Sequence, residues 1–189
     1  MRLTCELGGI RESGISSPDQ YGAIMPSTDV VELILQDHRR MEDLFRTMRN
    51  AESDRAAALE EFAHLLIAHA SAEEDEVYPA LRRYKNVDGE DVDHSVHEHQ
   101  EANEALLALL EVEDTGSEEW DEKLEELVAA VNHHADEEER TLLNDARENV
   151  ADERRSQLGA AFREARAKYL ESGCGSIDNV REVAASSGK

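Results

Sequence analysis

Residues 59–79 read LEEFAHLLIAHASAEEDEVYP, and this stretch places a histidine and a glutamate on one side of a helix. His69 and Glu73 are four residues apart, so a helix brings them to the same face, one turn from each other. Phe62 and Leu66 continue that face, which indicates that it points into a core. A buried charge is costly unless it is paired or bound to a metal, so the pair predicts a polar site inside an apolar interior.

The same pattern occurs a second time further along the chain. His134 and Glu138 have the same spacing, and they follow a Leu-Glu-Glu-Leu segment at the distance at which Leu-Glu-Glu-Phe precedes His69. A single histidine precedes each pair at a similar distance, His38 in the first copy and His99 in the second. The central region therefore predicts one helical hairpin written twice, and each copy carries a histidine followed by a His-x3-Glu pair.

The chain of 189 residues is strongly acidic, with 44 Asp and Glu against 20 Lys and Arg and a formal net charge of −24. Nucleic-acid phosphates and anionic membrane surfaces bind through Lys and Arg, so we expect neither nucleic acid nor a membrane as a partner. Aromatic residues make up 4% of the chain, a composition that favours helices over strands. A chain of this length predicts a single domain.

The two cysteines, Cys5 and Cys174, lie near opposite ends of the chain and form no C-x2-C pair, so we expect them to be reduced in a cytoplasmic protein. No apolar run has the length of a membrane span, and the first residues lack the apolar core of a signal peptide. Residues 1–26 predict a loosely ordered arm, and Met25, just before a helix-start signal, is an alternative beginning of the functional chain.

Apolar periodicity predicts five helices. The first four are expected over about these ranges: 29–50, 53–83, 91–113 and 117–142. Short turns between long helices favour an all-α, up-down-up-down four-helix bundle over residues 27–150. A fifth helix is expected in residues 151–172, and the small residues of 173–189 predict a flexible tail. Pro79 is expected to kink or loosen the last turn of the second helix.

In such a bundle the histidines of both hairpins reach a similar depth, because each lies a similar length of helix from its turn. Six side chains are expected to converge there and bind metal: His38, His69, Glu73, His99, His134 and Glu138. The other four histidines point away from these positions around their helices and are expected at the surface: His64, His94, His97 and His133. Tyr78 is expected to be a core residue rather than a ligand, because it lies far along the helix from His69.

The ligand types narrow the choice of metal. Imidazole and carboxylate without a thiolate suit iron, manganese or zinc. Two carboxylates that can bridge favour two ions over one, whereas a structural zinc needs only four ligands and would leave Glu73 and Glu138 unexplained. The alternative without metal is a helical bundle whose core polar groups bond to one another.

These motifs resemble those of the hemerythrin-like, HHE cation-binding family. The resemblance rests on Asp37-His38, residues 73–79, Glu98-His99 and residues 133–138, and it covers about residues 29–147. It implies a four-helix bundle that holds two iron ions with bridging carboxylates and an oxo or hydroxo bridge. It also implies a small-molecule ligand, either dioxygen, peroxide or nitric oxide, in a role of binding, processing or sensing.

The chain departs from the oxygen-carrying members of that family in two places. They have a further histidine one turn after the histidine of the third helix, where this chain has Asn103. They also separate the last histidine and carboxylate by five residues, which would select Glu139 here, whereas the internal repeat favours Glu138. With one ligand fewer, each iron is expected to keep about one open coordination position unless Asn103, Glu42 or water fills it.

Open positions suit the turnover of peroxide or dioxygen better than reversible carriage. We therefore hypothesise a redox role connected with oxidative stress or iron, with Glu73 and Glu138 bridging the ions and the four histidines terminal. One alternative is a protein that only holds iron. Another is a non-enzymatic sensor, in which the state of the metal or oxygen changes partner contacts through the fifth helix or the tails.

Overall fold

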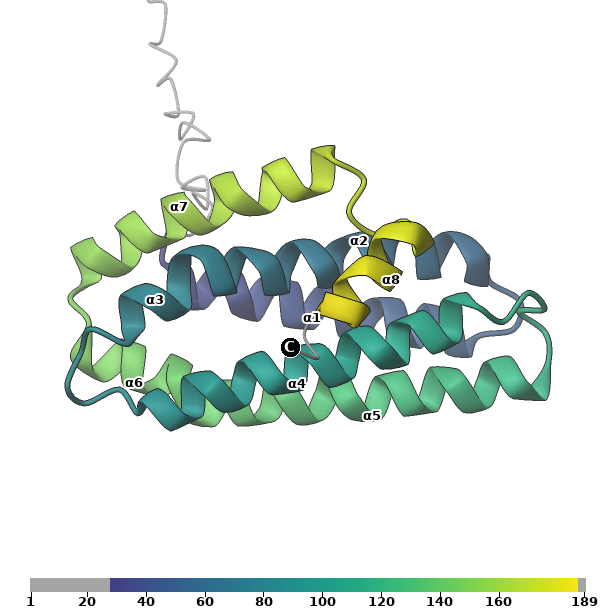
Figure 1. The fold of residues 1–189 in the computed structure, drawn as a ribbon, viewed down its shortest axis with the longest axis horizontal. Coiled ribbons are helices and arrows are strands. Elements are labelled where there is room, and N and C mark those ends of the chain that lie inside the picture. The colour runs from purple at the N-terminus through teal and green to yellow at the C-terminus, as the bar shows by residue number, and fades with distance from the viewer. Residues whose placement is uncertain (1–27, 187–189) are drawn as a thin grey trace, which may run out of the picture.

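The computed structural model describes residues 28–186, and this part of the chain folds entirely into helices and their connections (Figure 1). The elements are α1 (Val30–Arg49), α2 (Arg55–Ala72), the π-helical turn η1 (Glu73–Val77), α3 (Tyr78–Leu81), α4 (Gly89–Leu110), α5 (Glu118–Arg140), α6 (Leu142–Asn149), α7 (Asp152–Glu171) and α8 (Ile177–Ser186). The arm predicted for residues 1–26, with Cys5 and Met25, lies outside the described residues. None of the helices within 28–186 is both long and apolar enough to cross a bilayer.

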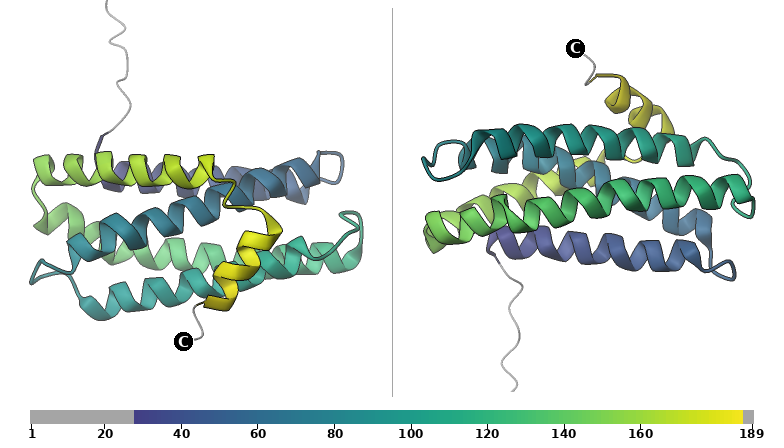
Figure 2. Two further views of the ribbon diagram at one scale, coloured as in Figure 1. Left: turned by 45° about the horizontal axis from the view of Figure 1, so that its top comes forward. Right: turned by 90° about the horizontal axis from the view of Figure 1, so that it is seen from below.

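Four long helices form the predicted up-down-up-down bundle. α1 and α2 make one antiparallel hairpin, and α4 and α5 make the other (Figure 2). Contacts of α1 with α5 and of α2 with α4 close the bundle. Each long helix begins where a short polar side chain accepts a backbone N–H of the first turn, which satisfies a donor that the helix itself leaves open. These capping residues are Asp29, Asp54, Asp88 and Ser117.

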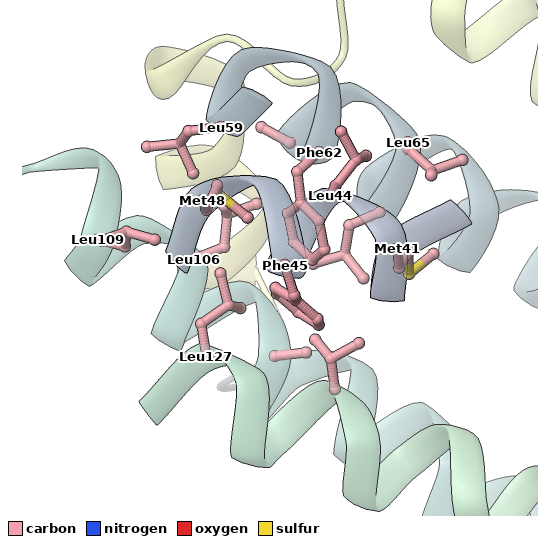
Figure 3. Close-up of a cluster of buried hydrophobic side chains, with 14 of the residues drawn as sticks. Met41, Leu44, Phe45, Met48, Leu59, Phe62, Leu65, Leu106, Leu109 and Leu127 are labelled. Carbon is pink, nitrogen blue, oxygen red and sulfur yellow. The ribbon is translucent and has the colours of Figure 1, made fainter. Parts of the chain in front are cut away.

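The apolar interior is divided into two clusters. The first apolar cluster lies toward the α1–α2 and α4–α5 turns and includes Phe45, Phe62 and Leu106 (Figure 3). The second apolar cluster lies at the other end of the bundle and includes Ile34 and Leu142. Full burial of a large apolar side chain contributes about 1.5–3 kcal/mol, so both clusters hold the helices in a fixed register. The polar positions predicted from the sequence fall between them.

The fifth helix, α7, lies along α2 and also contacts α1 and η1 (Figure 1). Its close approach to the start of α1 depends on Gly159, where a Cβ atom would lie 2.0 Å from the carbonyl oxygen of Thr28. Leu158 and Phe162, on either side of this contact, are buried in the second apolar cluster. The predicted fifth helix is therefore an integral layer of the molecule.

The chain after α7 differs from the flexible tail expected over residues 173–189. Residues 177–186 form α8, which packs across α4 (Figure 1). Val180 is fully buried in the first apolar cluster, and Val183 packs against it. Cys174 is a buried thiol that forms no disulfide within residues 28–186. An apolar face this short gives little periodicity in the sequence, and the helix is held by the α4 surface that it covers.

Candidate metal centre

The six side chains that the sequence predicts to converge do meet, in the polar layer between the two apolar clusters. None of the six is more than 4% exposed. Glu73 Oε2 lies 3.3 Å from His69 Nε2 and 3.3 Å from His99 Nε2. Glu138 Oε2 lies 3.5 Å from His38 Nε2, and His99 Nε2 lies 3.1 Å from His134 Nε2. Each of the four bundle helices contributes at least one of these atoms.

Several of these central atoms are buried without a hydrogen-bond partner among residues 28–186. They are His38 Nε2, His69 Nε2, Glu73 Oε1 and Glu138 Oε2. A buried polar atom left unpaired costs about 1–3 kcal/mol, so four at one point indicate that something else satisfies them. The possible ligand atoms also form two groups of three, each with all its atoms within 4.8 Å of one another. The first group comes from His38, His134 and Glu138, and the second from Glu73, His99 and His134. This donor set can hold a metal cation.

Each central histidine is oriented by a carboxylate on its outer nitrogen. The Nδ1 atoms pair as follows: His38 with Glu139 at 3.0 Å, His69 with Asp37 at 3.3 Å, His99 with Glu74 at 2.9 Å and His134 with Glu98 at 3.1 Å. In a neutral imidazole, a carboxylate that accepts the Nδ1 proton leaves Nε2 as the unprotonated nitrogen aimed at the centre, which is the form that binds a metal.

The orienting carboxylates repeat the internal symmetry of the sequence. Asp37 and Glu98 each orient the histidine on the other helix of their own hairpin. Glu74 and Glu139 each orient a histidine of the opposite hairpin. Sequence reasoning did not assign this role, although the signal was present, because an acidic residue adjoins His38, His99 and both glutamates in matching positions. Glu139 lies at the outer side of the ring, and Glu138 faces the centre.

Tyr78 reaches the centre through the π-helical turn before it. Its backbone N–H donates to the carbonyl of Glu73, five residues back. The regular i→i−4 hydrogen bonds are disrupted here, because Pro79 has no N–H and its ring clashes with the preceding turn. The widened turn brings the Tyr78 hydroxyl to 3.0 Å from Glu138 Oε1 and 3.3 Å from Glu73 Oε2. The hydroxyl also lies 3.4 Å from His99 Nε2. Tyr78 is buried as predicted, but its polar end belongs to the site, which a regular helix would not have allowed.

The electrostatics of the site give the two central carboxylates different pKa values. Burial and the neighbouring charge of Glu73 raise the pKa of Glu138 to about 8. Burial also acts to raise the pKa of Glu73, but the charges of His69 and His99 outweigh it and hold that pKa below its usual value. Burial acts to lower the pKa of His99, but hydrogen bonds to Glu73 and Glu74 raise it to about 10. At neutral pH Glu138 and His99 therefore each hold a proton that a cation would have to displace.

Comparison with known proteins assigns the family. Residues 29–146, more than half of the chain, match the family described as the hemerythrin HHE cation binding domain. The chain belongs to this hemerythrin HHE family. A DNA nickase of Nostoc sp. is 26% identical over 160 residues, which are 83% of this chain and 44% of that protein, so the chain spans less than half of the relative. An uncharacterized hemerythrin-like protein of Schizosaccharomyces pombe is 25% identical over 138 residues, which are 71% of this chain and 68% of that protein.

A solved structure has the same fold. The crystal structure of a hemerythrin HHE cation binding domain-containing protein of Mycobacterium kansasii matches with a TM-score of 0.70 at 23% identity, covering 81% of this chain and 98% of that chain. The all-α, hemerythrin-like bundle predicted from the sequence is thereby confirmed.

The HHE centre opens to solvent through a cavity of about 320 Å³ between α1 and α5. His38, His69, His99 and His134 contribute to its lining. Apolar side chains of both helices and of α2 also line it, among them Met41, Phe45, Leu66 and Val131. Glu42 stands at the exposed rim, where it pairs with Arg46 at 3.0 Å. The centre is thus buried but reachable by a small molecule.

Helix α7 lies beyond the matched family region and yet contacts the centre. Arg166 donates from Nε and Nη2 to Asp37 at 2.6 and 2.9 Å, and Asp37 in turn holds His69. The ring of Phe162 stands edge-on to His69, with 5.9 Å between centroids. Tyr169 donates to Asp75 of η1 at 2.6 Å. This helix therefore supports one side of the HHE site, a role that sequence reasoning did not assign.

The histidines predicted to lie outside the centre do lie outside it. His94, His97 and His133 are exposed, and His64 is half-buried with its Nδ1 bonded to the Glu60 carbonyl. Asn103, considered above as a possible ligand, is buried, and its Oδ1 has no hydrogen-bond partner within the described part of the chain.

Proposed function

We propose that this HHE domain holds two iron ions between its hairpins and turns over a small oxidant, hydrogen peroxide or dioxygen, at that centre. The residues that would hold the ions are the six predicted from the sequence, namely the four histidines and the carboxylates of Glu73 and Glu138. The observation that carries the proposal is the convergence of four imidazole Nε2 atoms and two carboxylates in one buried layer, where several of these atoms have no hydrogen-bond partner among residues 28–186.

An iron pair, when bound, supplies electrons to a small oxidant by changing between its ferrous and ferric states. The chain's own residues prepare the site for that chemistry. The four carboxylates on Nδ1 hold each imidazole ring in one orientation, with Nε2 toward the centre, before a metal binds. The two apolar clusters exclude bulk water on both sides of the polar layer.

Tyr78 is the group suited to proton transfer at this centre. Burial and the charge of Glu138 raise the pKa of its phenol well above the usual value, so the hydroxyl keeps its proton at neutral pH. It donates to Glu138 Oε1 at 3.0 Å, inside the polar layer. A phenol placed there can give a proton to a reduced oxygen species at the centre.

The size of the cavity favours a small ligand. A volume of about 320 Å³ admits dioxygen or hydrogen peroxide, and its walls combine apolar side chains with the central histidines and with charged residues. Disproportionation of hydrogen peroxide needs no further reactant, because two molecules give two of water and one of dioxygen. We therefore take peroxide as the first substrate to test.

The test combines metal analysis with oxygen evolution. Protein loaded anaerobically with iron is expected to hold two ions per chain and, after oxidation, to show near-ultraviolet charge-transfer absorption. Hydrogen peroxide is then added to the native chain, to His69→Ala and to the exposed control His97→Ala. Native and control protein are expected to evolve oxygen, and His69→Ala is not. Less than one iron ion bound per chain would contradict the metal centre and favour a helical bundle with a polar core. Equal oxygen evolution from all three proteins would exclude turnover at this centre.

A sensor is the second candidate, because α7 is connected directly to the centre. Arg166 holds Asp37, which holds His69, so a change in metal state at His69 reaches the surface of α7 through two hydrogen-bonded contacts. Hydrogen exchange along α7 in the metal-free, ferrous and ferric protein tests this candidate. Exchange that differs between the ferrous and ferric states would support signalling, and identical exchange would exclude it.

The activity named for the Nostoc relative is not extended to this chain. The match covers 44% of that protein, and a net charge of −24 opposes contact with a phosphate backbone.

A further inference from the structure

A second group of possible metal ligands lies on the outer face of the α4–α5 hairpin. It consists of His94 and Glu98 on α4 and His133 on α5. Glu98 Oε1 lies 3.3 Å from His94 Nε2 and 3.4 Å from His133 Nε2. The three atoms all lie within 4.8 Å of one another. His94 and His133 are exposed, so the group faces solvent and is separate from the buried ligand set.

Glu98 gives this group a fixed and unsatisfied acceptor. Its side chain is 3% exposed, and Oε1 accepts no hydrogen bond from any residue of 28–186. Its other oxygen, Oε2, accepts from His134 Nδ1 at 3.1 Å, which fixes the direction in which Oε1 points. A buried carboxylate oxygen without a donor is costly, and both imidazole Nε2 atoms already stand around it.

The spacing fits a tetrahedral metal site. Zinc binds imidazole nitrogen and carboxylate oxygen at about 2.0–2.1 Å, so neighbouring ligand atoms of a tetrahedron are about 3.3 Å apart. The two distances from Glu98 Oε1 have this length. His94 and Glu98 stand one helical turn apart, an arrangement that a helix supplies without strain.

We propose that His94 Nε2, Glu98 Oε1 and His133 Nε2 form a third metal site, for one divalent transition-metal ion of the zinc type, with solvent completing its coordination. Two imidazoles and one carboxylate match the ligand preference of Zn²⁺, Co²⁺ and Ni²⁺ over that of Ca²⁺ and Mg²⁺. An ion on Oε1 leaves Oε2 free to hold His134, so this site and the buried centre can be filled together. The site does not depend on the proposed redox function.

The surroundings favour a cation. Glu137 lies one turn after His133 on α5 and adds negative charge near Glu98. In this structure Glu137 pairs with Arg140 at 2.7 Å, so it contributes to the local field and is not counted among the ligands.

The test counts zinc ions bound by the full-length chain. Native protein, His94→Ala, His133→Ala and the control His97→Ala are equilibrated with Zn²⁺, and bound metal and affinity are measured by equilibrium dialysis with metal analysis and by calorimetry. His97 is a matched control, because it is exposed on the same helix and lies 3.5 Å from Glu101 one turn later. Glu98 is left intact because it also orients His134.

Native protein and His97→Ala are expected to bind one more zinc per chain than His94→Ala or His133→Ala, or to bind that ion at least tenfold more tightly. Equal stoichiometry and affinity in all four proteins would overturn the proposal, as would an equal loss in His97→Ala. If the buried centre bound no metal, the number of zinc ions per chain would be lower in all four proteins alike. The difference between the native protein and the His94→Ala and His133→Ala variants would remain. Circular dichroism of each variant shows that the comparison is made on folded protein.

Discussion

Tyr78 and Leu143 occupy matching positions in the two copies of the hairpin, and only Tyr78 carries a hydroxyl. The hydroxyl lies within hydrogen-bond distance of both central carboxylates and of His99, so a phenol is present on one side of the centre alone. The ligand set is nearly symmetric, with a histidine and a His-x3-Glu pair from each hairpin. The phenol therefore makes the two sides of the centre chemically different.

Tyr78→Phe removes only this hydroxyl and keeps the ring in its buried place. We expect bound metal to stay at the native level while peroxide turnover falls, on the order of a hundredfold, the effect of losing a positioned proton donor. Metal analysis and oxygen evolution measure the two quantities on the same sample. Tyr84→Phe is the control, because Tyr84 is half-buried beside the second apolar cluster. Native turnover in Tyr78→Phe would reduce the phenol to a packing role.

The raised pKa values of Glu138 and His99 predict how metal binding and stability depend on pH. Both groups hold a proton in the metal-free protein at pH 7, since their pKa values are about 8 and about 10. Metal ligands must be deprotonated, so we expect roughly two protons to be released per filled centre, and affinity to rise with pH. A pH indicator in weakly buffered solution measures the release. No release at pH 7 would contradict this charge assignment.

The same two groups should lower the stability of the metal-free protein as pH rises. Their folded pKa values lie above the ordinary values of 4.5 and 6.5, so the folded state binds more protons, and its advantage is lost between 4.5 and about 8 for Glu138 and between 6.5 and about 10 for His99. The windows overlap from about 6.5 to 8, where we expect the steepest fall. Calorimetric melting of metal-free protein across this range measures it, and a midpoint that rises with pH would contradict the assignment.

At the scale of the elements, the irregular turn η1 is what fits the second bundle helix to the site. Pro79 prevents a regular helix there, and the wider turn carries the chain from Glu73 to Tyr78 with both side chains facing inward. At the matching position of the second hairpin, the helix is interrupted in a different way. α5 ends at Arg140, Thr141 departs from helical geometry, and α6 starts afresh at Leu142.

The contact between α7 and the start of α1 gives a prediction about packing. Gly159→Ala would place a Cβ atom 2.0 Å from the backbone oxygen of Thr28, and backbone on both sides would have to move. We expect a loss of about 1–3 kcal/mol in the free energy of unfolding, or several degrees in Tm. Gly89→Ala is the control, because nothing lies within 4 Å of its Cβ position at the start of α4. Denaturant unfolding of both variants measures the difference, and equal stability would show that α7 tolerates a larger separation.

At the scale of the whole molecule, two similar hairpins make the centre and a fifth helix supports one side of it. The two apolar clusters hold the hairpins together on both sides of the polar layer, so the ligands are positioned by packing that involves every bundle helix. α7 adds the Arg166–Asp37 pair and the Phe162 ring behind His69. The HHE region alone would leave this side of His69 without its cover.

The support from α7 can be measured separately from its contribution to folding. Arg166→Gln keeps the helix and removes the charged pair with Asp37, so we expect metal affinity to fall about tenfold, the usual effect of loosening an outer partner of a ligand, with a nearly native Tm. Deletion of residues 151–189 also uncovers part of both apolar clusters, and both affinity and Tm are expected to fall. Metal titration and thermal melting separate the two effects. Native metal affinity in both proteins would show that α7 does not support the metal centre.

The pattern of the sequence was sufficient to predict much of the fold and of the candidate site. The His-x3-Glu spacing, repeated with an upstream histidine, predicted helices, their pairing and the six residues of the centre, because helical periodicity ties sequence spacing to one face. The preference for Glu138 over Glu139 also followed from the repeat. The metals themselves, the substrate and the flexible arm remain predictions.

By itself, then, the sequence determined which residues share a helical face and at what depth, since local geometry decides both. Only the tertiary structure decided which carboxylate meets which Nδ1, that Tyr78 enters the centre, that His94 and His133 meet at Glu98, and that residues 177–186 form a helix. The physical reason is that each of these depends on contacts between helices far apart in the chain, where the rotation of one helix against another fixes which side chains touch. Spacing along a single helix carries no information about that rotation.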